Sequence, residues 1–169
     1  QLLATKQQDW SKWHIYHGDE RCLPVDDAER NSLVADQKWL DLVAIPKTQV
    51  HAIPAELGAE TGAESYAKDV EQAGKFDLVL LGMGEDGHTA SLFPGHVHNA
   101  EELTHAVHNS PKPPADRVSI SAKALSNTEE LIFVVSGAKH DAVAAWKNKE
   151  DLPVTHLCPA SGVDVLLSV

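Results

Sequence analysis

A continuously apolar stretch that ends in closely spaced glycines constrains this chain more than any other feature. Residues 78–81 read Leu-Val-Leu-Leu, and the pattern Gly-x-Gly-x-x-Gly follows over residues 82–87. A short apolar run bounded by turn residues is typical of a strand that is covered on both faces within a parallel sheet. Ligands of open α/β sheets bind beyond the carboxyl ends of the strands. We therefore expect chemistry at Asp86 and His88, where this strand has just ended.

The glycine pattern of residues 82–87 has two simpler interpretations. One is the dinucleotide fingerprint, which requires a long helix after the last glycine and an acidic residue about 20 positions further on, at a strand end. Pro94 limits any helix here to a turn or two, and Glu101 and Glu102 lie in a histidine-rich segment without strand character. These features argue against a nicotinamide cofactor. The other interpretation, glycines that serve only a tight turn, stays open.

The complete string over residues 82–94, Gly-Met-Gly-Glu-Asp-Gly-His-Thr-Ala-Ser-Leu-Phe-Pro, is more specific. It resembles the signature of the 6-phosphogluconolactonases, which share a superfamily with the glucosamine-6-phosphate deaminases. Gly84 and Gly87 would bring the backbone close to substrate, because a residue without Cβ permits the approach. We expect the imidazole of His88 to project into the crevice as the general base, and Asp86 to orient it or to fix its tautomer.

A second motif, Gly-Asp-Glu-Arg-x-x-Pro over residues 18–24, follows a strand expected at residues 13–17. Glycine and proline bracket a turn at the end of this strand. By itself, the acidic-basic triplet indicates a solvated turn with a local salt bridge. The motif is also similar to the second signature of the lactonase family. That resemblance implies that Arg21 helps to bind the anionic substrate, and that Asp19 orients His88 or the substrate hydroxyls.

Two further cations follow strand or loop boundaries. Arg117 begins an alternating strand after the proline-rich loop 110–114, and Lys139 opens a helix after the apolar strand 131–135. A guanidinium suits bidentate contact with a phosphate, and a lysine at a helix N-terminus is unfavourable unless an anion joins it. The resemblance implies a phosphate-binding role for both. The simpler alternatives are a contact of Arg117 with Asp116 or a loop carbonyl, and a solvated Lys139.

The remaining chain alternates between strand and helix patterns. Apolar residues at helical spacing predict one helix between Asp27 and Pro46 and another that ends at Gly74. A last strand is expected over residues 163–169. This alternation is typical of right-handed βαβ crossovers. We expect an α/β fold, with three α/β/α layers around a mostly parallel, modified Rossmann-like sheet.

Composition excludes several classes of function. The chain has 169 residues, of which 43% are hydrophobic and 23% charged, as in one soluble domain. The 25 acidic and 14 basic residues give a formal charge of −11, which disfavours nucleic acid and anionic membranes as partners. No apolar run approaches the roughly 18 residues of a membrane span, so we expect a cytoplasmic protein. Cys22 and Cys158 lack the spacing of a zinc ribbon, a redox motif or a disulfide framework.

Four histidines at positions 96, 98, 105 and 108 invite a metal interpretation. They lack the HExxH pattern and a fixed pair with nearby carboxylates, so we expect solvent-exposed loop side chains instead. The family resemblance also implies catalysis without a metal. We expect no cofactor, a sugar-phosphate lactone as the small-molecule partner, and a monomer or weak homo-oligomer.

One departure from the family pattern concerns the N-terminus. Family members carry a Ser-Gly-Gly-Ser-Thr-Pro-like loop upstream of the Gly-Asp-Glu-Arg strand, and its backbone amides hold the phosphate. The sequence from Gln1 onward contains no such loop. We therefore expect residues 1–169 to form a single lactonase domain that lacks its N-terminal strand, helix and phosphate loop.

The resemblance implies hydrolysis of 6-phospho-D-glucono-1,5-lactone to 6-phosphogluconate in the oxidative pentose phosphate pathway. Such a reaction needs a base that deprotonates water, stabilisation of an oxyanion and contacts to the remote phosphate. A glucosamine-6-phosphate deaminase or isomerase would share the fold and His88. However, Phe93 stands where the deaminases have a glutamate, and Arg21 where they have a tyrosine. A non-catalytic sugar-phosphate sensor is the third alternative, and the intact Asp86 argues against it.

Overall fold

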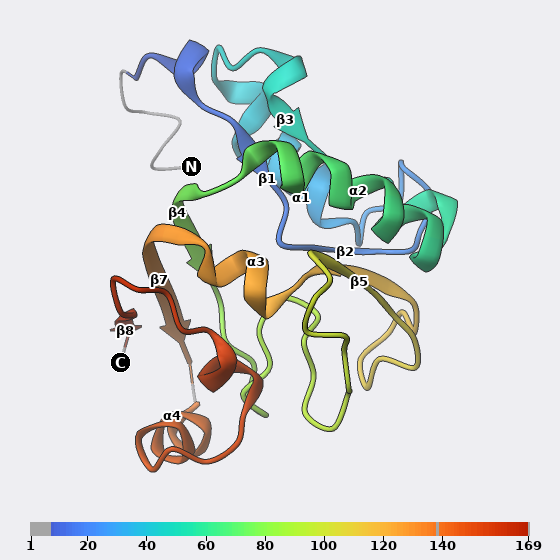
Figure 1. Ribbon diagram of the computed structural model, residues 1–169. Helices are drawn as coiled ribbons and strands as arrows, with labels where there is room; N and C mark the ends of the chain where they lie inside the picture. Colours follow the sequence, from blue (N-terminus) through green and yellow to red (C-terminus); the bar gives the residue numbers. More distant parts are fainter. Residues whose placement is uncertain (1–7, 138, 169) are drawn as a thin grey trace.

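The computed structural model describes residues 8–137 and 139–168 (Figure 1). Among the helices of these residues, none combines the length and the apolar character needed to cross a membrane. The strands are β1 Ile15–Tyr16, β2 Asp19–Arg21, β3 Val50–His51, β4 Phe76–Leu81, β5 Thr104–Val107, β6 Arg117–Ile120, β7 Thr128–Ser136 and β8 Asp164–Ser168, and the α-helices are α1 Asn31–Lys38, α2 Ala59–Ala73, α3 Ala122–Ser126 and α4 His140–Lys147. The strands and helices alternate only in part, because β4, β5 and β6 follow one another without a helix between them.

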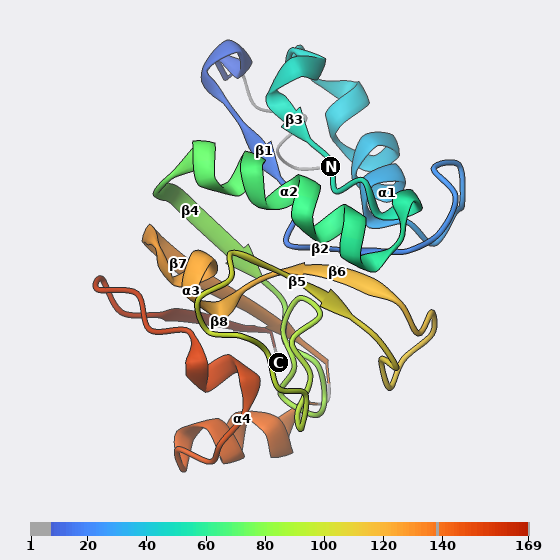
Figure 2. The ribbon, with the colours of Figure 1, turned by 45° about the vertical axis from the view of Figure 1, so that its right-hand side comes forward.

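The strands form three small sheets. The first has the order β4-β7-β8 and the second pairs β1 with β3, and all of these neighbours are parallel. The third sheet, β2-β6-β5, is antiparallel and was not predicted. Figure 2 shows α2 lying across this antiparallel sheet, with β4 descending toward the part of the molecule that carries α4. The predicted α/β class therefore holds, although one of the sheets is not parallel.

Strand β4 is covered on one face only. Val79 and Leu81 are buried, whereas Leu78 and Leu80 are 43% and 57% exposed. Successive side chains of a strand point to opposite faces, so the two exposed leucines share one face of the sheet. The expectation of a strand covered on both faces is wrong for the described residues. The apolar run was sufficient to identify the strand but not its surroundings.

Helix α2 packs against β5 and β6 and also contacts the ends of β1 and β3. Its apolar face, including Tyr66 and Val70, is buried, as its helical spacing predicts. The Tyr66 hydroxyl is within hydrogen-bonding distance of two backbone carbonyls, at His17 (3.0 Å) and His51 (3.2 Å). These contacts tie α2 to the ends of β1 and β3. The helix stops where predicted, at Gly74, whose φ of +65° favours glycine.

The predicted helix before Pro46 is shorter than expected, and its start is set from outside the helix. Only residues 31–38 form α1. The helix starts at Asn31, where the carboxylate of Glu20 on β2 accepts hydrogen bonds from the amides of Asn31 (2.7 Å) and Ser32 (2.8 Å). Glu20 is fully buried and lies 3.5 Å from the Arg30 side chain. The glutamate of the Gly-Asp-Glu-Arg motif thus caps a helix, which satisfies the amides at its N-terminus.

His108 joins α2 to the loop that precedes β6. Its Nε2 lies 2.7 Å from Glu60 Oε1, and its Nδ1 lies 2.9 Å from Asp116 Oδ1. Hydrogen bonds to Asp116 and then Glu60 raise the pKa of His108 above its ordinary value of 6.5. Protonated His108 therefore holds two carboxylates together.

This contact predicts a pH dependence of stability. A raised folded-state pKa means that His108 stabilises the fold fully below pH 6.5, and that this contribution is lost as pH rises through the raised pKa. The melting temperature of the wild type should exceed that of His108→Gln at about pH 6, and the difference should shrink by about pH 8. Because the side chain is 44% exposed, added salt should weaken the effect. A difference that stays constant with pH would contradict this assignment.

Candidate active site

The loop after β4 folds back on itself and returns His88 to the strand end. The amide of Gly84 donates to the carbonyl of His88 (2.8 Å), and the amide of Gly87 donates to the carbonyl of Gly84 (3.2 Å). The hydroxyl of Thr89 donates to the carbonyl of Gly82 at 2.8 Å. These bonds close residues 82–89 into a compact turn, which we call the catalytic turn after the role predicted for His88.

The sequence correctly pairs Asp86 with His88. His88 Nδ1 lies 2.5 Å from Asp86 Oδ1, and the imidazole is 17% exposed. Burial acts to raise the pKa of Asp86, but hydrogen bonds from His88 outweigh it and hold that pKa below its ordinary value. An ionised Asp86 that accepts the Nδ1 proton leaves Nε2 of a neutral His88 free as a base. The geometry is therefore that of a carboxylate-oriented histidine.

Because Gly84 has no side chain, the His88 ring can occupy the space next to its Cα atom. A Cβ added at Gly84 would lie 2.0 Å from His88 Nδ1 and 2.8 Å from Asp86 Oδ1. Distances under 3.0 Å are essentially never seen for real Cβ atoms. The predicted close approach of Gly84 and Gly87 to substrate stays a prediction, but Gly84 is required by the Asp86–His88 pair itself.

The second motif does not form the predicted turn. Asp19–Arg21 is strand β2. It pairs antiparallel with β6, which lies far along the chain and begins at Arg117. Gly18 separates it from β1, and its carbonyl accepts a hydrogen bond from Ile120 at 2.8 Å. The pairing places Asp19 opposite Ser119 and Arg21 opposite Arg117. The sheet therefore brings the two predicted arginines to the same ladder.

Asp19 lies in a network that the sequence analysis did not foresee. Its carboxylate accepts hydrogen bonds from Ser91 Oγ (2.6 Å) and Asn31 Nδ2 (3.0 Å) and lies 3.9 Å from Arg117 Nη1. Burial raises the pKa of Asp19 above its ordinary value. Ser91 belongs to the string that also carries His88, so this contact links β2 to the segment that directly follows the catalytic turn. Ser91 had no signal beyond its place in the string over residues 82–94, and Asn31, which lies outside both motifs, had none.

Arg117 is buried and contacts loop carbonyls, which was the simpler alternative. Its guanidinium donates to the carbonyls of Lys112 (3.1 Å), Pro113 (2.7 Å) and Pro114 (3.2 Å). Its Cζ atom also lies 5.7 Å from the centre of the Phe93 ring. Burial lowers the pKa of Arg117 below its ordinary value. A phosphate contact for Arg117 stays a prediction, with Nη1, which faces Asp19, as the nitrogen that would make it.

The other two predicted cations lie apart from the Asp86–His88 pair. Arg21 Nη1 donates to the carbonyl of Glu29. Lys139 is the residue before α4 and lines a cavity of about 220 Å³ together with residues from β7, α4 and β8, such as Val135 and Leu167. Within residues 8–137 and 139–168, His88 has no hydrogen bond or ion pair with either cation. Their roles toward an anionic substrate stay predictions.

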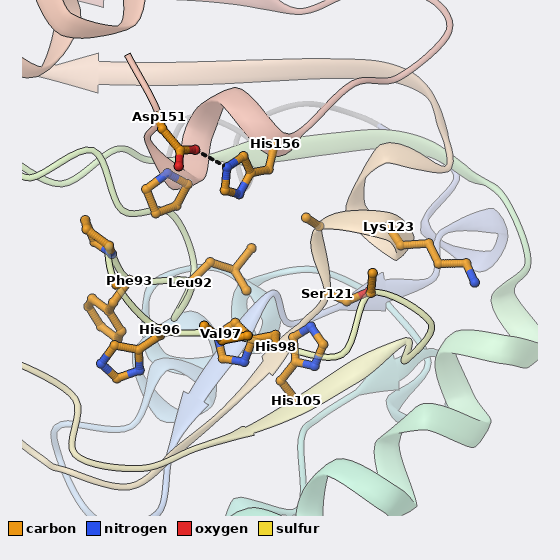
Figure 3. A pocket seen from close by; sticks show the side chains of 15 residues that line it. Leu92, Phe93, His96, Val97, His98, His105, Ser121, Lys123, Asp151 and His156 are labelled. Carbon is orange, nitrogen blue, oxygen red and sulfur yellow. Dashed lines mark hydrogen bonds and ion pairs between the residues drawn. The ribbon is translucent and has the colours of Figure 1, made fainter. Parts of the chain in front are cut away.

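A larger cavity of about 640 Å³ lies beside the catalytic turn (Figure 3). Phe93 lines it and also contacts the His88 ring, with centroids 4.8 Å apart. Figure 3 shows Asp151 paired with His156 at one side of this cavity, and the rings of His98 and His105 beside each other at another. Phe93 therefore contacts both the cavity and the His88 ring.

The expectation that the loop histidines are solvent-exposed is wrong for three of them, since His105 is buried and His96 and His98 are half-buried. His105 lies on β5 and is buried, and its ring stacks on the half-buried His98 at a centroid distance of 4.3 Å. Burial, together with His105 and His96, lowers the pKa of His98 to about 4. The stacking of these two rings is a packing arrangement. Across residues 8–137 and 139–168, no group of three or more His, Cys, Asp or Glu side chains could hold a metal ion.

Comparison with known proteins places this geometry in a family context. The family described as glucosamine-6-phosphate isomerases/6-phosphogluconolactonase matches residues 1–166. A 6-phosphogluconolactonase of Mycobacterium leprae is 41% identical over 160 residues, which cover 85% of this chain and 65% of the relative. A probable chloroplastic 6-phosphogluconolactonase of Oryza sativa is 36% identical over 177 residues, or 92% of this chain and 54% of the relative. The chain thus spans between about half and two thirds of the length of these relatives.

The fold comparison agrees. The crystal structure of a 6-phosphogluconolactonase from Thermotoga maritima superimposes with a TM-score of 0.92 at 26% identity, and covers 98% of this chain and 77% of that one. This likeness confirms the predicted α/β fold with its three layers.

Proposed function

Because the chain belongs to the family of glucosamine-6-phosphate isomerases and 6-phosphogluconolactonases, we propose that it hydrolyses 6-phospho-D-glucono-1,5-lactone to 6-phosphogluconate. The observation that carries this proposal is the 2.5 Å contact between His88 Nδ1 and Asp86 Oδ1 at the carboxyl end of β4. The names of the relatives support the same reaction. The pathway of the reaction, the cytoplasmic location and the oligomeric state remain predictions.

In the proposed mechanism His88 acts as a general base. Nε2 takes a proton from water while the water oxygen attacks C1 of the lactone and forms a tetrahedral oxyanion. When the intermediate collapses, the bond between C1 and the ring oxygen breaks. The imidazolium of His88 returns its proton to that oxygen, which becomes the C5 hydroxyl, and the new carboxylic acid ionises. Asp86 stabilises the imidazolium in between, since the two groups are already in contact.

Backbone amides of the catalytic turn are the proposed oxyanion donors. Two amides of this turn, those of Gly84 and Gly87, already donate to carbonyls within it. The proposal therefore falls on the remaining amides between them, at Glu85 and Asp86. Donors fixed in this way cost little reorganisation when the charge forms.

Arg21, Arg117 and Lys139 are the proposed contacts to the phosphate of the substrate. Arg21 and Arg117 lie opposite each other on adjacent strands, and Asp19, two residues before Arg21, lies on the same face of the β2–β6 ladder and 3.9 Å from Arg117. Fork-shaped guanidinium groups suit a phosphate ester, and Lys139, which precedes α4, would add a point charge. Asp19 is proposed to orient substrate hydroxyls, because Asp86 and not Asp19 contacts His88.

A deaminase or isomerase of the same family is the alternative to be tested. Isomerisation needs further groups that open the sugar ring and shuttle a proton between carbons. Phe93 contacts the His88 ring where the deaminases have a glutamate, and a hydrocarbon ring cannot accept a hydrogen bond from the imidazole. This contact favours the hydrolytic reaction.

The full-length protein should open 6-phosphogluconolactone well above the spontaneous rate and release no ammonia from glucosamine 6-phosphate. Unphosphorylated gluconolactone should be hydrolysed with a kcat/KM at least about tenfold lower, because the charge-assisted phosphate contacts are missing. Acid formation and ammonia release are measured side by side on the same preparation. Ammonia release as fast as lactone opening would reassign the reaction. Equal use of both lactones would remove the phosphate contacts from the proposal.

A further inference from the structure

A leucine far along the chain, Leu152, packs against Gly87 of the catalytic turn. We infer that Leu152, in the connection between α4 and β8, is a positioning residue that holds the turn in the shape in which Asp86 and His88 meet. This inference rests on the proposed function, because it assigns Leu152 a role through the base His88. The contact itself can be observed without an activity assay.

Leu152 packs directly against Gly87, the residue between Asp86 and His88. A Cβ built on Gly87 would lie 2.9, 3.1 and 3.2 Å from Leu152 Cδ1, Cδ2 and Cβ. Gly87 has a φ of +77°, which residues with a side chain rarely adopt. The leucine therefore fills the space that any side chain at position 87 would need.

A hydrogen bond fixes the other side of the same residue. The amide of Val154 donates to the carbonyl of Gly87 at 3.2 Å. Gly87 is thus contacted twice from the 152–154 segment, once by packing and once by its carbonyl. The two contacts together define the orientation of the peptide groups that flank Gly87.

The segment that carries Leu152 is itself stiff. Thr155 Oγ1 lies 2.6 Å from the carbonyl of Leu152, to which the Thr155 amide also donates at 2.8 Å. Pro153 fixes its own φ, and Val154, whose amide contacts Gly87, is buried in the main core. Because this segment is anchored in the core, Leu152 resists displacement, and the position of Gly87 is set by its contact with Leu152.

The Asp86–His88 pair has little freedom of its own. Gly84 limits the ring on one side, since even a methyl group there would lie 2.0 Å from Nδ1. Any shift of Gly87 therefore changes the distance between its two neighbours. Misplacement of a catalytic group by about 1 Å can lower a rate by roughly a hundredfold.

The test compares Leu152→Ala with Leu157→Ala, a leucine of the same segment that is buried in the core. Leu152→Ala should lower kcat about tenfold or more and leave KM within about twofold, because the base and not the binding groups is displaced. Leu157→Ala should lower the melting temperature at least as much while keeping kcat. Leu152→Met, which retains a side chain of similar volume, should recover most of the activity.

A second readout follows the imidazole directly. Ring ¹H–¹⁵N correlation spectra, with the His88 signal assigned by its loss in His88→Gln, should show the Nδ1-protonated tautomer in the wild type and in Leu157→Ala. That signature should be lost or averaged in Leu152→Ala. If Leu152→Ala does not fold, Leu152→Val gives the same comparison with a smaller truncation. An intact His88 signature together with an unchanged kcat would overturn the inference. Absence of lactonase activity in the wild type would refute the proposed function alone, since the spectra still decide the role of Leu152.

Discussion

Replacement of His88 by glutamine is expected to lower kcat for 6-phosphogluconolactone by at least about a hundredfold, the lower end of what a general base contributes. Glutamine has a similar size and can still donate to Asp86, but its amide does not accept a proton near neutral pH. His88 is only 17% exposed, but glutamine fills a similar volume and can keep the contact with Asp86, so the substitution opens no large cavity. The melting temperature should therefore change little while the rate falls.

The assay must separate catalysis from the spontaneous opening of the lactone, so initial rates are taken at low pH and short times and the uncatalysed rate is subtracted. His108→Gln is the matched control, because it removes a histidine that pairs with Glu60 and Asp116, away from the catalytic turn. This control should retain kcat. A His88→Gln variant with nearly normal kcat would remove His88 from the mechanism.

The elements with strong local patterns were predictable from the sequence. The helical spacing of apolar residues located α2 and its end at Gly74, and continuous apolar runs located β4 and β7. The Asp86–His88 pair was predictable for the same reason. The two residues flank Gly87 in a tight turn, so their side chains lie close together. Short-range features of this kind depend on the neighbouring residues alone.

Features that depend on distant partners were not predictable. Asp19–Arg21 is a strand because β6 lies beside it, and no period in three residues reveals that pairing. The loop carbonyls that hold Arg117, and the packing of Leu152 against Gly87, likewise come from the folded arrangement. Leu78 and Leu80 were predicted to be buried, but they are exposed. An apolar run alone does not reveal which elements pack against each face of the strand. Long-range contacts therefore account for most of the differences between expectation and structure.

Gly84→Ala is expected to be nearly as damaging as the loss of His88 itself. The added methyl group would lie 2.0 Å from His88 Nδ1 and 2.8 Å from Asp86 Oδ1, so the ring must leave its position and the hydrogen bond to Asp86 must break. We expect kcat to fall by about a hundredfold, the cost of displacing a general base. Gly82→Ala is the matched control, because a methyl group at Gly82 would meet nothing within 4 Å. Both variants stiffen the same loop, and only one of them reaches the imidazole.

The double variant Gly84→Ala/His88→Gln distinguishes this cause from a general disturbance of the loop. If Gly84→Ala acts only by displacing His88, then combining it with the loss of His88 should lower kcat no further than about the larger single effect, since groups that act as a unit are not additive. A product of the two losses would mean that Gly84 also serves something else, such as the predicted approach of the backbone to substrate. Gly82→Ala combined with His88→Gln should match His88→Gln alone. A normal kcat in Gly84→Ala would show that the ring works from a different position, and that the Asp86 contact is dispensable for the base.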